Sequence, residues 1–150
     1  MENKNEAMRT YIEEDLKSFP EIMPGTLNHR MDPSLESCDE EAHTMVLRFP
    51  FADWERNGIG TLHGGIMFSS MDLSMSMLLR YFAQSAIPPT VSLTVNFLRP
   101  VSMKEGYFLV SCRQTSLGKR NGTVYAEVLI PSSGKIAATG IGTFAIVRAE

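Results

Sequence analysis

The chain has 150 residues, of which 43% are hydrophobic and 21% charged, and its formal net charge is −3. This length suits one domain with a core of its own, so we expect a single domain over residues 1–150. Acidic and basic residues are scattered along the chain without a basic run, which argues against a nucleic-acid partner. Asp72 and Arg80 interrupt the longest apolar stretch, residues 66–83, and the sequence therefore predicts no membrane span.

The two cysteines, Cys38 and Cys112, have neither metal-ligand spacing nor a disulfide pattern. The first residues are also too polar for a secretory signal, and both observations favour reduced thiols in a cytoplasmic protein. No cluster of His, Cys, Asp and Glu has the spacing of a metal site, so we expect no bound metal ion.

The first part of the chain combines one helix with two strands. Apolar residues recur at helical spacing over residues 5–19, which predicts an amphipathic helix, and Pro20 should end it. Strands are expected at 35–38 and 43–49, with a polar turn between them. Residues 50–62 are rich in glycine and are expected to form a loop.

A second, longer helix is predicted from about residue 63 to residue 82, where 87–89, Ile-Pro-Pro, prevents its continuation. The rest of the chain is rich in β-branched and aromatic residues and predicts a four-strand meander, with strands at 91–97, 107–115, 123–130 and 136–147. Together these elements indicate an α+β fold, in which an antiparallel sheet packs one face against the long helix.

The start of the long helix has the features of an anion site. Gly64 and Gly65 would leave the N–H groups of the first turn open to a ligand oxygen, and the helix dipole adds partial positive charge there. Such a site can stabilise a carbonyl oxygen that gains negative charge during nucleophilic attack. His63 alone is weaker evidence, because a residue at a helix start often bonds only to nearby backbone.

Asp72 is an isolated acid in the middle of this apolar helix, where a buried carboxylate without a partner would be costly. Two interpretations are open. The carboxylate could be satisfied by Ser69, by Ser76 or by a backbone group. Alternatively, it could be a base or nucleophile for hydrolysis.

The spacing of the two features predicts an oligomer. Asp72 follows His63 by nine residues, which is about 13 Å along a helix and roughly half a turn out of phase. Asp72 therefore cannot easily serve the anion site at the start of its own helix. If both groups act in one reaction, two chains must supply them across a two-fold axis, which requires a dimer with two composite sites.

Three segments together resemble the PaaI-like acyl-CoA thioesterases of the hotdog superfamily, over roughly residues 40–147. They are Asn57-x5-His63-Gly64-Gly65-x6-Asp72, the segment Pro-Thr-Val-Ser-Leu-Thr-Val-Asn-Phe-Leu-Arg-Pro at 89–100, and the closing Gly-x-Gly-Thr-Phe. The resemblance implies a hotdog fold, with a long central helix wrapped by a curved antiparallel sheet, here with an extra N-terminal helix. It also implies homodimers with a continuous sheet, often paired into homotetramers.

The same resemblance implies a role for each residue of the motif. The Gly64 N–H would polarise the thioester carbonyl, and Asn57 would hold the attacking water or the thioester. Asp72 would be the general base or nucleophile, contributed by the opposite subunit, while His63 would orient the loop. Ser92 would assist the water or Asp72.

The implied substrate is an acyl- or aryl-CoA thioester, hydrolysed without a metal or organic cofactor. Basic side chains would bind the phosphates of coenzyme A, although each candidate is also explained as a solvated turn charge; they are Arg99, Lys104, Lys119 and Arg120. The acyl group would lie against the helix and the 91–97 strand, where the candidates are Gly65, Met67, Phe68 and Met71.

Two other functions fit a chain of this kind. A hydratase or dehydratase of acyl thioesters would need a catalytic His with an acid at another spacing, which His63 and Asp72 do not provide. A non-catalytic acyl-CoA-binding module could use the same pocket, although the complete set of Asn57, Gly64 and Asp72 argues for catalysis.

Overall fold

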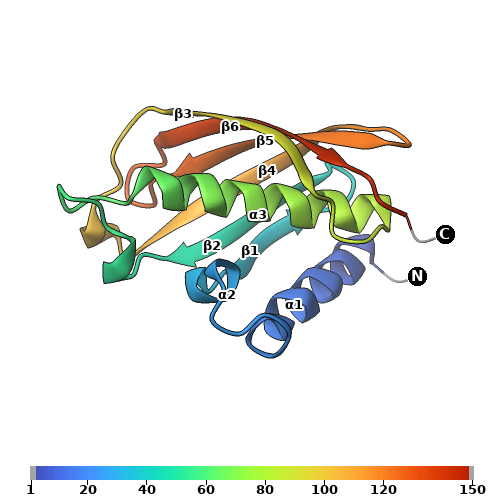
Figure 1. Cartoon of the computed structure of the whole chain (residues 1–150), viewed down its shortest axis with the longest axis horizontal. Coiled ribbons are helices and arrows are strands. Elements are labelled where there is room, and N and C mark those ends of the chain that lie inside the picture. The colour runs from blue at the N-terminus through green and yellow to red at the C-terminus, as the bar shows by residue number, and fades with distance from the viewer. Residues whose placement is uncertain (1–2, 149–150) are drawn as a thin grey trace.

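A six-stranded antiparallel sheet curves around one long helix in the computed structural model, which describes residues 3–148 (Figure 1). The strands are β1 Ser34–Asp39, β2 Thr44–Pro50, β3 Thr90–Phe97, β4 Tyr107–Leu117, β5 Asn121–Leu129 and β6 Ile136–Ala145. The helices are α1 Lys4–Ile22, α2 Leu27–Met31 and α3 Gly64–Ala83, with 3-10 turns η1 Asp53–Glu55 and η2 Met103–Glu105. The predicted α+β architecture is confirmed, and its strands lie within a few residues of the expected positions.

The predicted four-strand meander is wrong in one respect, the position of β3. The sheet order is β1-β2-β4-β5-β6-β3, so β4, β5 and β6 form a meander while β3 pairs with β6 at the far edge. The segment 98–106 between β3 and β4 contains Pro100 and η2, and it is too long for a tight hairpin turn. This segment allows the chain to leave one edge of the sheet and re-enter beside β2.

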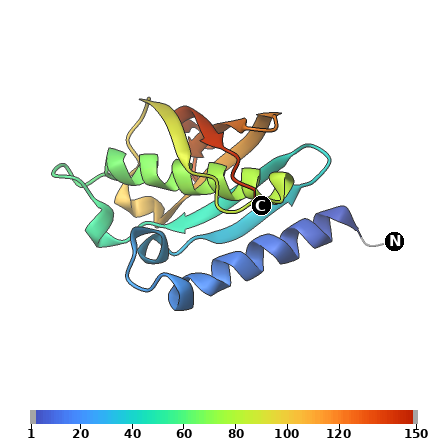
Figure 2. The same ribbon diagram turned by 45° about the vertical axis from the view of Figure 1, so that its right-hand side comes forward.

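The N-terminal helix is longer than predicted. Helix α1 includes Pro20, which does not end it; the helix continues to Ile22, where the Met23 N–H donates to the Phe19 carbonyl oxygen. The expected apolar face is buried, and Figures 1 and 2 show α1 beside β1, at the edge of the sheet. The short helix α2 was not predicted, because five residues carry too little periodicity.

Helix α3 packs closely on the sheet because β6 has glycines where the helix crosses it. A Cβ atom at Gly140 would lie 2.7 Å from Met71 Cε, and one at Gly142 would lie 2.7 Å from Met75 Sδ. Both methionines are fully buried. The closing Gly-x-Gly motif therefore sets the spacing between helix and sheet, and Met71 belongs to the core. None of the helices within residues 3–148 is long and apolar enough to cross a membrane.

Candidate active site

The start of α3 leaves one backbone donor free, whereas the sequence predicted that the N–H groups of the first turn would be open. His63 is the N-cap residue, and its Nδ1 accepts a hydrogen bond from the Gly65 N–H at 2.8 Å. The His63 carbonyl oxygen accepts from the Ile66 and Met67 N–H groups. The Gly64 N–H has no hydrogen-bond partner in the part of the chain that the structure describes. It is therefore the donor available to a ligand.

Gly65 has a structural role in this arrangement. A Cβ atom there would lie 3.0 Å from His63 Nδ1 and 3.2 Å from Cε1, so a larger residue would displace the capping imidazole. Gly65 thus allows His63 to cap the helix. The Gly65 N–H itself is already occupied.

Asn57 organises the loop that precedes α3. Its Oδ1 accepts the N–H groups of Ile59 at 3.1 Å and Thr61 at 3.0 Å, while its Nδ2 donates to Thr61 Oγ1 at 2.9 Å. This side chain therefore fixes the turn from 57 to 61 against the start of α3. One Nδ2 hydrogen is not used by these bonds, and amide nitrogens carry two donors.

Glu55, a buried residue, stabilises the same loop through its hydrogen bonds. Its side chain is buried, its Oε1 accepts the Ala52 N–H at 2.8 Å, and its carbonyl oxygen accepts the His63 N–H at 2.9 Å. Burial raises the pKa of the Glu55 carboxyl, and its Oε2 has no partner among residues 3–148. Glu55 was not predicted from the sequence, because nothing in its local pattern distinguishes it from a surface acid.

Gly64 lines an open hollow of about 320 Å³. Four of the predicted site residues meet there, and the lining consists of Asn57, Ile59, Thr61, Leu62, Gly64, Met67, Phe97, Leu98, Arg99 and Pro100. The Phe97 ring covers the glycine, since a Cβ atom at Gly64 would lie 3.4 Å from it. Lys119 and Arg120 are not part of this hollow; their turn, between β4 and β5, lies at the opposite end of the sheet (Figure 1).

Asp72 lies about 12 Å further along α3, on a different cavity. The residue is half-buried, rather than fully buried as the apolar sequence around it suggested, and its Oδ1 accepts a hydrogen bond from Thr90 Oγ1 at 2.6 Å. Ser69 and Ser76 do not satisfy it, because their hydroxyls donate to the Gly65 and Pro88 carbonyl oxygens. Its cavity, of about 250 Å³, shares no lining residue with the hollow at Gly64.

Thr90 is the site residue that the sequence interpretation missed. The register between β3 and β6 shifts between Thr90 and Ser92, so Val91 forms a bulge and Thr90 reaches Asp72. Ser92 is exposed, and no hydrogen bond joins it to Asp72 within the described residues. No sequence pattern distinguished Thr90, because the bulge at Val91 breaks the two-residue alternation of the strand.

Two further predicted residues occupy different places on α3. Phe68 is exposed between Gly64 and Asp72 at i+4 spacing, on the outer face of the helix. Met71, packed against Gly140, lines neither of the two cavities. Within residues 3–148, no group of three His, Cys, Asp or Glu side chains has the arrangement of a metal site.

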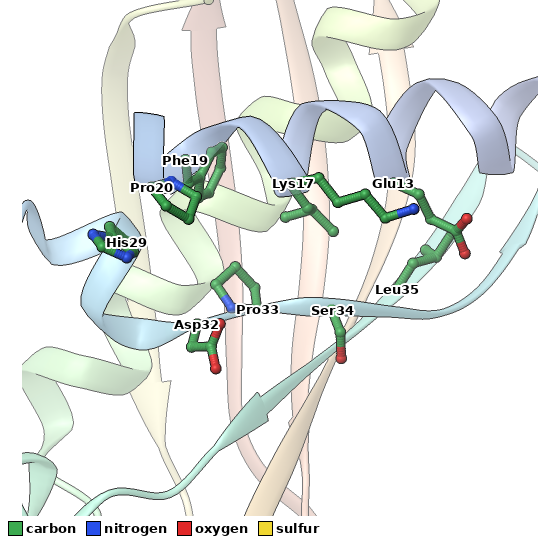
Figure 3. Close-up of a pocket in the computed structure, with 10 residues that line it drawn as sticks. Glu13, Lys17, Phe19, Pro20, His29, Asp32, Pro33, Ser34 and Leu35 are labelled. Atoms are coloured by element: carbon green, nitrogen blue, oxygen red, sulfur yellow. The ribbon is translucent and has the colours of Figure 1, made fainter. Parts of the chain in front are cut away.

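A third cavity, the largest of the three at about 480 Å³, lies between α1 and β1 (Figure 3). Glu13 and Lys17 of α1 border it on one side, and His29 and Asp32 on the other. None of the predicted site residues lines it. Size alone therefore does not identify the site in this chain.

A curved antiparallel sheet around one long helix defines the hotdog fold, which this chain has. The sequence matches the thioesterase superfamily over residues 59–137, more than half of the chain, and the chain belongs to this family. A curated relative from Saccharolobus solfataricus, named a putative esterase, is 35% identical over 102 residues. That match covers 68% of this chain and 66% of the relative, just under two thirds of its length.

Solved structures confirm the hotdog fold. Zebrafish thioesterase superfamily member 2 superposes with a TM-score of 0.80 at 16% identity, over 92% of this chain and 97% of that one. The Escherichia coli PaaI protein of the phenylacetic acid degradation operon superposes with a TM-score of 0.75 at 18% identity, over 93% and 96%.

Proposed function

We propose that this protein hydrolyses an acyl- or aryl-CoA thioester to the free acid and coenzyme A, in a site shared by two subunits. One observation carries the proposal: Gly64, whose N–H is free in the described chain, and the Asp72–Thr90 pair line two separate cavities along one helix. A single chain cannot bring these groups to one carbonyl carbon, because about 12 Å of helix separates them. A second copy, related by a two-fold axis, can complete each half.

The chemistry follows from the two groups. The thioester oxygen would accept the Gly64 N–H, with the helix dipole stabilising the negative charge of the tetrahedral intermediate. Asp72 would take a proton from water as the water oxygen bonds to the carbonyl carbon. The carbon–sulfur bond then breaks, and the thiolate of coenzyme A leaves and gains a proton. Thr90 occupies Asp72 Oδ1, which leaves Oδ2 for the water.

The edge of the sheet supports a dimer. Strand β3 is the last strand in the order and pairs only with β6 in the described chain, so its other edge is open to a second copy. Apolar side chains are exposed along it, with Val91 64% and Phe97 53% accessible. Antiparallel pairing of two β3 strands would extend the sheet and set the two α3 helices side by side in opposite directions, as a homodimer or as half of a homotetramer.

The coenzyme A part of the substrate would bind in the hollow lined by Gly64. Arg99 is the basic residue there, and one of its guanidinium nitrogens already donates to the Ile136 carbonyl oxygen at 2.8 Å, which holds the side chain in place. Lys119 and Arg120 stay predictions as phosphate ligands, because they would have to reach the substrate from another subunit. A cytoplasmic location, without nucleic-acid or membrane partners, also remains a prediction.

A thiol-release assay over aliphatic and aryl CoA esters tests the proposed function. We expect hydrolysis of at least one ester with kcat near 1 s⁻¹ or above, in the range of ordinary enzymes, roughly 1–10³ s⁻¹. If no ester in the panel releases thiol while the protein still binds acyl-CoA, the protein is a binding module and the proposed reaction is wrong.

Replacing Thr90 by valine should lower kcat by about 10- to 100-fold with little change in KM. The variant removes a hydrogen bond to a charged group, which is typically worth about 1.5–3 kcal/mol, and it keeps the side-chain volume. Thr90→Ser should restore most of the rate, because it retains the hydroxyl. Ser92→Ala is the matched control and should keep the parental kcat; if it instead has the larger effect, Ser92 is the residue that positions Asp72.

A further inference from the structure

We propose that the cavity beside Asp72 is the acyl pocket of the site, that it receives an apolar acyl group of roughly eight carbons, and that helix α1 limits the length of that group. This inference rests on the proposed function and deepens it. It assigns to the N-terminal helix, which lies outside the matched residues 59–137, a role in choosing the substrate.

Four parts of the chain form this cavity, and most of its lining is apolar. Helix α1 and the residue that follows it supply one wall, α3 supplies another, the segment before β3 supplies the third, and α2 adds one residue, Asn28. The apolar members of the lining are Phe19, Ile22, Met23, Leu73, Met77, Ile87, Pro88 and Pro89. A compartment of this kind favours a hydrocarbon group over a charged one.

Charged residues lie at the two ends of the cavity. Ser76 of α3 lies between them and donates its hydroxyl to the Pro88 carbonyl oxygen, and Asn28 of α2 is also part of the lining. Asp72 and its partner Thr90 form one end. Arg80, eight residues further along α3, forms an ion pair with Asp15 of α1 at 3.0 Å and closes the other end. About 12 Å of helix separates the two ends. An acyl chain that enters past Asp72 would therefore run along α3 and stop at the ion pair.

The volume fits the acyl part of the substrate and excludes the rest. Sites for whole drug-sized ligands have volumes of about 300–1,000 Å³, whereas this cavity has about 250 Å³. At about 30 Å³ for each heavy atom, as for a water molecule in the liquid, roughly eight atoms fill it. Coenzyme A, large and charged, would remain in the open hollow at Gly64 of the partner subunit. The thioester would then span the interface, with its acyl group on the Asp72 side.

Helix α1 can adjust this pocket without touching the reacting groups. Ile22 lines the cavity from the last turn of α1, and 62% of its surface is exposed, so a larger side chain can be accommodated at the rim. Phe19 and the Asp15–Arg80 ion pair hold the helix against α3. A change at Ile22 should therefore alter the space that the rim of the pocket leaves for longer acyl groups, and it should leave Asp72, Thr90 and Gly64 in place.

The experiment is a series of kcat/KM values for straight-chain CoA esters from two to sixteen carbons, with an arylacetyl ester of eight carbons beside the octanoyl ester. We expect about a fourfold rise for each methylene that enters the pocket, ending near eight carbons. The higher of the two eight-carbon values identifies a chain or a ring as the preferred group. If both fall below the butyryl value, the inference is wrong.

Two variants at one position test the role of α1. Ile22→Trp should lower kcat/KM for the octanoyl ester at least tenfold and leave the acetyl and butyryl values unchanged. Ile22→Ala should move the optimum to longer chains. Lys17→Trp is the matched control, because Lys17 lies on the same helix but lines the cavity on the β1 side; it should leave the series unchanged.

The possible failures are distinguishable. If the parent protein hydrolyses esters but both Ile22 variants show the parental length series, the acyl group lies elsewhere, while the proposed hydrolysis stands. If Ile22→Trp loses short esters as well, the fold is damaged and the Ile22→Ala series decides alone; an unchanged optimum there overturns the inference. If the parent hydrolyses no ester at all, the proposed function fails first.

Discussion

Replacing Asp72 by asparagine should lower kcat by about 10³-fold, within the 10²–10⁴-fold range of general acid–base catalysis. Asparagine has nearly the same shape and can still accept the Thr90 hydroxyl through its oxygen, so the fold and the cavity should remain intact. What it cannot do is take a proton from water. KM should therefore change little, and steady-state kinetics on the best CoA ester measures both constants.

The control for this substitution is Asp32→Asn. Asp32 is exposed, lies on the cavity between α1 and β1, and has a left-handed backbone (φ 50°) that asparagine adopts readily. Its kcat should equal that of the parent. If Asp72→Asn also retains the parental kcat, Asp72 has no part in the reaction and the hydrolytic mechanism must use another base.

Replacing Gly64 by proline should lower kcat by about 10²- to 10³-fold while the melting temperature changes little. Proline removes the one free N–H of the helix start, and loss of a single oxyanion donor has an effect of this size. The position tolerates proline well: it is the first residue of α3, and the preceding His63 has ψ 131°, which suits a residue before proline. Gly64→Ala, which keeps the N–H, is the matched control and should remain active.

Mixing the two inactive variants tests whether the site is shared. A heterodimer of Asp72→Asn and Gly64→Pro chains would contain one intact site and one with both defects. After unfolding and refolding an equal mixture, about a quarter of the parental activity per chain should return, because half of the dimers are mixed and each has one working site. No recovery, with mixed dimers verified by mass spectrometry, would mean that both groups act within one chain.

The sequence predicted the parts of this fold that depend on local pattern. Helix α3 and the strands of the β4–β5–β6 meander have clear periodicities and turn residues, and their positions agree with the structure. The place of β3 was not predictable in the same way, since its pairing with β6 joins residues about 45 positions apart in the chain. Helix α2 was too short to leave a periodic signal.

The candidate site, like the fold, was only partly predictable from the sequence. The glycines at the start of α3 predicted an open N–H, and the family resemblance indicated Asn57, Met67 and Arg99. The structure brings these three residues and Gly64 to one hollow. The hydrogen bonds of these residues could not be predicted from the sequence, however, because the His63 side chain folds back and accepts the Gly65 N–H. A one-residue bulge likewise replaced Ser92 by Thr90 as the partner of Asp72. Side-chain rotamers and bulges of this kind depend on tertiary packing.

The separation of the Gly64 hollow from the Asp72 cavity has a consequence for how such an enzyme responds to its own abundance. Since each isolated chain would carry only half of a working site, the rate per molecule should fall on dilution, as subunits dissociate. Well below the dissociation constant of the dimer, total activity should grow with the square of the protein concentration. A cell could then adjust thioester hydrolysis more steeply than it adjusts the amount of the protein.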